Sequence, residues 1–113
     1  MKEMTTAMIE MRNTLMVRVS ELTGVAGDDI MSKNRTFAVT DARSLVAWAL
    51  IDLCGVGVRA AGILLRRNYS DMVYLRKRIT GGMRLTAEME DAMREIRTFV
   101  KQLKQSRLWT TAK

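Results

Sequence analysis

Apolar side chains recur at intervals of three and four residues along most of this chain, which places them on one face of an α-helix. In residues 3–23 the repeating set is Met4, Met8, Met11, Leu15, Val19 and Leu22. Residues 86–106 carry a second set, formed by Met89, Met93, Ile96, Phe99, Val100 and Leu103. We find no convincing strand pattern, and the chain contains no proline. These features predict an all-α fold.

Shorter helices are expected between these two segments. Glycines and polar residues mark where each one starts and stops. We expect a helical turn at 27–31 with an Asp as N-cap, followed by a polar loop at 32–38. An apolar helix capped by Thr40 or Asp41 should then run to Cys54. After it we expect a helix at 58–65 and a further helix that is capped by Asn68 or Ser70 and stopped by Gly81-Gly82. Gly24 stops the first helix and Thr86 caps the last. The prediction is a single helical bundle spanning residues 1–113.

The composition points to a polyanionic partner. The net charge is +7, the chain has no histidine, and Cys54 is its single cysteine. Without histidine the commonest general base and the commonest metal ligand are missing, so we expect no enzyme activity, no metal and no cofactor. No run of residues is apolar enough for a membrane span, and one buried cysteine suits a reducing compartment. A cytoplasmic protein is expected.

Two local motifs have structural explanations. Residues 55–60 match the glycine pattern of dinucleotide-binding loops, but that pattern requires a preceding strand, and here a helix is expected. We therefore interpret them as a turn between helices. Acidic residues cluster at the start of the last helix, where they complement the helix dipole: Glu88, Glu90, Asp91 and Glu95.

Residues 58–79 have the spacing of a helix–turn–helix, with a short helix, a turn of about four residues and a second helix. Residues 59–84 include seven cations and one anion. In such a unit the start of the second helix meets base edges and flanking cations hold phosphates. The candidate base-contacting residues are Asn68, Tyr69 and Ser70, and the candidate backbone-contacting residues are Arg66, Arg67, Arg76 and Lys77. A helical hairpin with a solvated basic face is the structural alternative.

A polar basic loop, Ser32-Lys33-Asn34-Arg35, precedes this unit, and Arg43 follows eight residues after Arg35. Before the loop, the segment from Leu22 to Ile30 has a glycine and an aspartate at a turn. This order of features resembles the C-terminal DNA-binding domain of the bacterial replication initiator DnaA, a Trp-repressor-like helix–turn–helix. The resemblance spans residues 15–79 and does not include the last helix at 86–106.

The resemblance implies roles for individual residues. In the family the first loop arginine enters the minor groove and the second contacts phosphate, which implies those roles for Arg35 and Arg43. Lys33 and Asn34 belong to the same loop. The family signature is arginine-aspartate-histidine-threonine-threonine-valine, and it aligns with Asn68 to Val73. Only the valine, a core position in the family, is identical. The 113 residues hold no counterpart of the initiator's ATPase domain.

We therefore predict a small non-enzymatic protein that binds double-stranded DNA, in the regulation of replication, transcription or mobile-element DNA. The alternative is a protein-interaction module that kept the fold and lost sequence-specific DNA binding. Its partner would be another protein or a second copy of the chain, docked on the apolar stripe of the last helix. The other explanation of that stripe is packing against the chain's own first helix.

Overall fold

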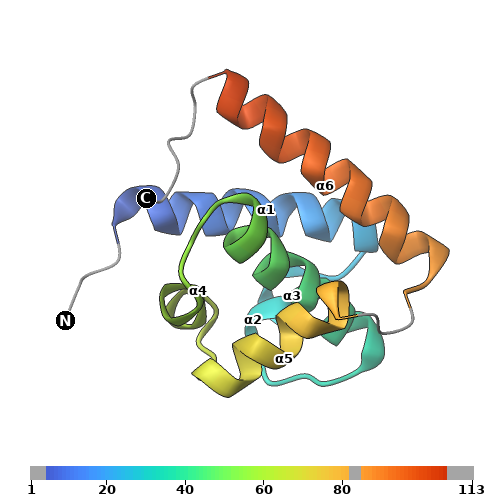
Figure 1. The fold of residues 1–113 in the computed structure, drawn as a ribbon. Coiled ribbons are helices and arrows are strands. Elements are labelled where there is room, and N and C mark those ends of the chain that lie inside the picture. Colours follow the sequence, from blue (N-terminus) through green and yellow to red (C-terminus); the bar gives the residue numbers. More distant parts are fainter. Residues whose placement is uncertain (1–4, 82–84, 107–113) are drawn as a thin grey trace.

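The computed structural model describes residues 5–81 and 85–106, and these form helices joined by short loops (Figure 1). Those residues include no strand, so the all-α prediction is confirmed. In chain order the elements are α1 (Thr6–Thr23), α2 (Gly27–Met31), α3 (Phe37–Trp48), the π-helical segment η1 (Ala49–Leu53), α4 (Val58–Leu65), α5 (Tyr69–Thr80) and α6 (Ala87–Gln105).

α3 lies at the centre of the core, as expected for the most apolar helix. Its residues are buried without interruption from Ala42 to Trp48, because α1, α2 and α5 pack around it. Every helix contributes to the core. The most deeply buried side chains include Leu15, Ile30, Leu45, Leu50, Leu64, Met72 and Ile96. Each such side chain stabilises the fold by about 1.5–3 kcal/mol when it leaves water.

Three predicted helix boundaries are confirmed. α1 ends at Gly24, which adopts the left-handed conformation at φ 78°. The Asn68 side chain caps α5 by accepting a hydrogen bond from the Asp71 amide at 2.8 Å. Thr86 caps α6 in the same way, with its hydroxyl 3.1 Å from the Met89 amide. Each of these signals acts within one turn of chain, so the sequence alone suffices to place it.

Two other predicted caps are wrong. The N-cap of α2 is Ala26. Asp28 and Asp29 lie in the first turn of this helix, where they complement the helix dipole. α3 begins at Phe37 with Thr36 as its N-cap, so Thr40 and Asp41 lie inside the helix. α5 ends at Gly81 as predicted, while Gly82 lies outside the described residues.

The turn after η1 is the segment that matched the dinucleotide-binding pattern. Gly55 adopts φ 74°, and the Val56 amide donates to the Leu50 carbonyl at 2.9 Å. A helix precedes this turn and another follows it, so the interpretation as an inter-helix turn is confirmed. Beside it, Cys54 is buried, and this burial raises the pKa of its thiol to about 11. The thiol therefore stays protonated at neutral pH.

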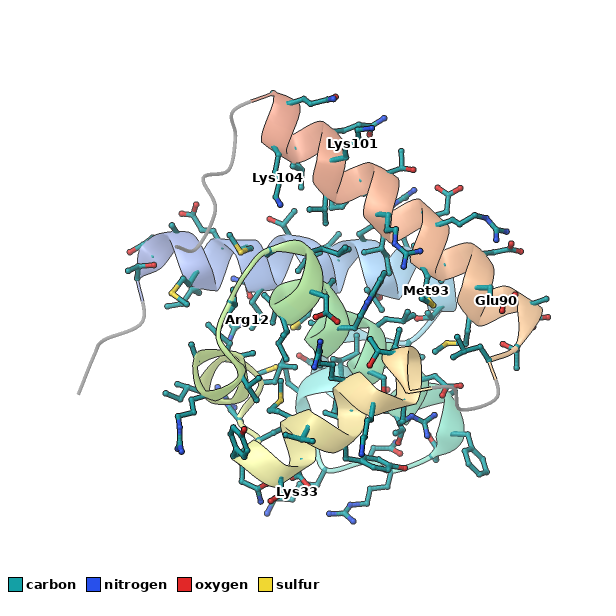
Figure 2. All side chains as sticks on the ribbon, viewed as in Figure 1. Arg12, Lys33, Glu90, Met93, Lys101 and Lys104 are labelled. Atoms are coloured by element: carbon teal, nitrogen blue, oxygen red, sulfur yellow. The ribbon has the colours of Figure 1, made fainter. Side chains whose placement is uncertain are left out.

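The apolar stripe of α6 packs against the same chain. Figure 1 shows α6 running across α1, and Met89, Ile96 and Val100 are buried there. Two cations of α6 contact the ends of α3 and η1. The Arg97 guanidinium lies 5.1 Å from the centre of the Trp48 ring, and Lys104 Nζ donates to the Leu53 carbonyl. Lys104 can be seen in Figure 2. The stripe thus closes the core between α1 and η1.

α4 and α5 form the expected pair, with α4 seen end-on in Figure 1 and α5 running across the view. Gly62 makes their close approach possible, because a Cβ at this position would lie 2.7 Å from the Arg67 carbonyl oxygen. The Arg67 amide in turn donates to the Gly62 carbonyl at 2.8 Å. Arg12 of α1 braces the end of α4 by donating to the Leu64 carbonyl at 2.9 Å.

We expect Gly62→Ala to lower the free energy of unfolding by about 1–3 kcal/mol, because the new methyl group meets backbone that cannot move aside cheaply. Gly57→Ala is the matched control, since a Cβ there meets nothing within 4 Å. Urea denaturation monitored by circular dichroism measures both. Equal stability of the two variants would contradict the close packing at Gly62.

Candidate nucleic-acid interface

The basic loop, which we define as Ser32–Thr36, joins α2 to α3 and holds its own shape. The Ser32 hydroxyl donates to the Asp29 carbonyl at 2.7 Å and accepts from the Asn34 amide at 3.0 Å. The Asn34 side chain accepts from the Thr36 amide at 2.9 Å. Lys33, Asn34 and Arg35 are exposed on this frame. The loop therefore presents its charges from a backbone that is already ordered.

Arg43 anchors the loop to α3. The side chain is only 3 % exposed. Its Nε donates to the Ile30 carbonyl at 2.8 Å, and its Nη2 lies 3.1, 2.9 and 3.0 Å from the carbonyl oxygens of Asp29, Ser32 and Asn34. The resemblance implies a phosphate contact for Arg43. In the structure this part of its guanidinium is instead committed to the loop backbone.

Arg67 ties the basic loop to the turn between α4 and α5. Its Nη2 donates to the Ser32 carbonyl, the same oxygen that Arg43 contacts. Its Nε is buried and meets no acceptor among the described residues. Two segments that are far apart in sequence are therefore fixed side by side, and the loop runs below α5 in Figure 1.

A pocket of about 300 Å³ lies between the basic loop and α5. We call it the arginine pocket, and its lining residues are Arg35, Thr40, Arg43, Arg67, Asp71, Tyr74 and Leu75. Three guanidinium groups thus share one concave site with one carboxylate. Burial, followed by the charges of Arg67 and Arg35, lowers the pKa of Arg43. The cost of these like charges makes the pocket a favourable place for an anion, and guanidinium groups match phosphate geometry.

The turn between α4 and α5 contains a strained residue. Arg66 adopts the left-handed conformation with φ 58° and ψ 44°, and it is the one non-glycine residue with positive φ in the described part of the chain. Glycine ordinarily takes this position at the end of a helix, because a side chain makes the conformation costly. Arg66 is also exposed, so its side chain contributes little packing in return.

The exposed face of α5 carries both apolar and polar side chains. Its residues are Tyr69, Ser70, Val73, Tyr74, Arg76, Lys77 and Thr80. Arg59 of α4 supports the start of this face, with its guanidinium carbon 5.1 Å from the centre of the Tyr69 ring. The cation–π contact favours one position of an aromatic side chain that is half exposed.

Val73 was predicted to be a core residue, and that prediction is wrong. Its side chain is 38 % exposed. The buried face of α5 is formed by Met72, Leu75 and Ile79, whose spacing of three and four places them together. Val73 lies one residue beyond Met72, about 100° around the helix, and so points away from the core.

The remaining basic residues of α5 are not equivalent. Arg76 forms an ion pair with Asp52 of η1, with Nη2–Oδ1 at 2.9 Å and Nε donating to both carboxylate oxygens. This hydrogen bond and the charge of Asp52 raise the pKa of Arg76. Arg78 pairs with Asp41 of α3 and donates to the Ser44 hydroxyl. Arg76 is therefore partly neutralised, whereas Lys77 forms no ion pair with the described residues.

The structure thus brings most of the predicted residues onto one side of the molecule. Arg35, Arg43 and Arg67 meet in the arginine pocket, and the cap and first turn of α5 supply Asn68, Tyr69 and Ser70. Thr40 and Tyr74 also line the pocket and were not predicted as site residues. Tyr74 follows Asp71 by three residues in α5, so helical spacing was a signal that could have found it.

The described residues contain no cluster of histidine, cysteine and acidic side chains that could hold a metal ion. Across the same part of the chain, no helix has the length and apolarity needed to cross a bilayer. No known protein family matches the sequence, and no curated protein is significantly similar to it.

We expect Arg43→Met to lower the free energy of unfolding by about 3 kcal/mol, because it leaves several backbone carbonyls without their charged donor. Thermal unfolding measures the loss, and amide hydrogen exchange at Asn34 and Thr36 should accelerate as the loop loosens. Arg35→Ala is the control, since that side chain is exposed. An unchanged exchange rate in Arg43→Met would contradict the anchoring role.

Proposed function

We propose that this chain is a small non-enzymatic DNA-binding protein whose helix–turn–helix, α4 and α5, acts together with the basic loop on double-stranded DNA. The observation that carries the proposal is the convergence of Arg35, Arg43 and Arg67 around one pocket beside the start of α5. Positive charge concentrated at the N-terminus of an exposed helix favours phosphate, because the helix dipole has the same sign there. The net charge of +7 acts in the same direction.

The dimensions of α5 suit a recognition helix. Its twelve residues span about 18 Å, and a B-DNA major groove about 12 Å wide admits an α-helix. In our proposal Asn68, Tyr69 and Ser70 face the groove. Lys33, Arg35, Arg66 and Lys77 then contact the flanking backbone, while Arg43 and Arg67 hold the loop in place and complete the arginine pocket.

Burial on α5 also bears on the DnaA resemblance. The family's valine is a core position, and Met72, one residue before Val73, is the buried one here. Shifting the alignment by one residue pairs the signature arginine with Arg67 and its aspartate with the cap Asn68. The first threonine then pairs with Ser70. In this register the chain resembles the family signature more closely than the sequence alignment implies, which supports a DnaA-like helix–turn–helix.

Arg66 gives independent support. A residue held in a costly backbone conformation indicates that another role retains it, since most proteins place glycine at such a helix end. Arg66 lies at the turn, between α4 and the capping residue of α5. A phosphate beside the helix–turn–helix would be the natural partner of its exposed guanidinium.

We expect Arg35→Ala to weaken binding to a mixed-sequence duplex by about 1–3 kcal/mol and to reduce the slope of log affinity against log salt by about one. Fluorescence anisotropy across a salt series measures both quantities. Arg94→Ala is the charge-matched control, because Arg94 is exposed on α6 and pairs only with its neighbour Asp91 among the described residues. Identical losses in the two variants would mean that only net charge matters.

Arg66→Gly separates stability from function. Glycine relieves the left-handed conformation, so thermal unfolding should show a gain of about 1 kcal/mol, while the loss of a backbone contact should weaken DNA binding. A variant that is more stable yet binds DNA as tightly as the wild type would remove Arg66 from the interface.

A second candidate function, a protein-interaction module, is favoured by one observation. α4 and α5 expose large apolar and aromatic side chains, namely Ile63, Tyr69, Val73 and Tyr74. Weak duplex binding that varies little with salt and ignores Arg35 would favour this candidate.

A further inference from the structure

Phe37 is the most exposed large apolar side chain described in this chain, with 84 % of its surface open to solvent. It is the first residue of α3, directly after the basic loop. Exposing a phenylalanine forgoes the free energy that its burial would supply. A single exposed apolar residue has no special meaning, so its surroundings decide what it can do.

Those surroundings are cationic and ordered. Phe37 follows Arg35 by two residues and precedes Thr40 by three, and both of these neighbours line the arginine pocket. Two steps of extended chain separate the Cα atoms of Arg35 and Phe37 by at most about 7 Å. The hydrogen bonds of Asn34 and Arg43 fix the backbone on which Phe37 stands.

We infer that Phe37 is a wedge that inserts between adjacent base pairs and kinks the duplex, an inference that rests on the proposed DNA binding. Proteins that enter the minor groove with cationic side chains commonly place an apolar wedge beside them, and the unstacked bases then cover it. In this arrangement Arg35 contacts the backbone at the edge of the minor groove and Phe37 occupies the opened step. Pyrimidine–purine steps, which unstack most easily, are the preferred points of insertion.

Charge selects DNA over a protein or a second copy of the chain as the occupant. The basic loop contains no acidic residue, and Lys33 and Arg35 lie just before Phe37. The nearest following acid, Asp41, is paired with Arg78. A second copy would bring the same cations against these, whereas a nucleic acid offers both the phosphates for the cations and an apolar base stack for the ring.

The test uses the whole chain and a duplex enriched by the wild-type protein from a randomised pool, carrying fluorophores at both ends. Energy transfer between the ends reports bending, and 2-aminopurine placed at successive positions reports unstacking. Phe37→Ala should keep its thermal stability and lose most of the bend and the 2-aminopurine signal. Its affinity should fall about 5- to 50-fold, because the burial of the ring is lost while the cost of unstacking the bases is no longer incurred. Phe37→Leu, which retains an apolar wedge, should keep much of the bend.

Val17→Ala removes another exposed apolar side chain, 60 % open to solvent, from α1 and is the control. A Phe37→Ala protein that binds and bends the duplex as the wild type does would overturn the wedge and leave the proposed function intact. Failure of the wild-type protein to enrich or bind any duplex would overturn both.

Discussion

The buried guanidinium of Arg43 is the contact on which the arrangement of the basic loop depends. A charge that leaves water is costly unless hydrogen bonds replace its hydration, and four backbone carbonyls of α2 and the basic loop do so here. The loop therefore cannot move without leaving Arg43 unpaired. Because Arg67 shares the Ser32 carbonyl, the same constraint reaches the turn between α4 and α5. The basic loop and the turn between α4 and α5 are thus joined through one carbonyl oxygen.

Several features of the surface around this loop and turn lower the stability of the folded chain. Three arginines line one pocket and the adjacent Arg66 occupies a left-handed conformation, while Phe37 is left in solvent. Each of these features raises the free energy of the isolated protein, and all lie along the loop and the turn that it contacts. The scaffold on the other side, where α1 and α6 pack together, follows ordinary rules of capping and apolar burial. Costs that cluster in this way support the proposed function, because a bound polyanion would offset the repulsion between the arginines.

The sequence was a good guide where the deciding interaction is local and a poor one where it is tertiary. Helical periodicity predicted every long helix, and Gly24, Asn68 and Thr86 marked their ends correctly. The start of α3 was missed because the hydrogen bonds of the loop, rather than Thr40 or Asp41, decide it. The anchoring role of Arg43 could not be predicted either. The backbone carbonyls to which it donates come together only when α2 packs on α3. Val73 was misplaced because a single-residue error in a helix turns a side chain by about 100°.

The distribution of charge gives the same surface a long-range effect. Acidic residues of α6, including Glu90, lie on a different part of the molecule from Lys33 of the basic loop (Figure 2). Two cations of α5 are paired with acidic residues of the neighbouring segments, Arg76 with Asp52 and Arg78 with Asp41. Lys33, Arg35 and Lys77, by contrast, form no ion pair with the described residues. In the proposed function these unpaired cations would both attract the DNA over a distance and contact its phosphates, because surface charge of opposite sign raises the rate of encounter as well as the affinity.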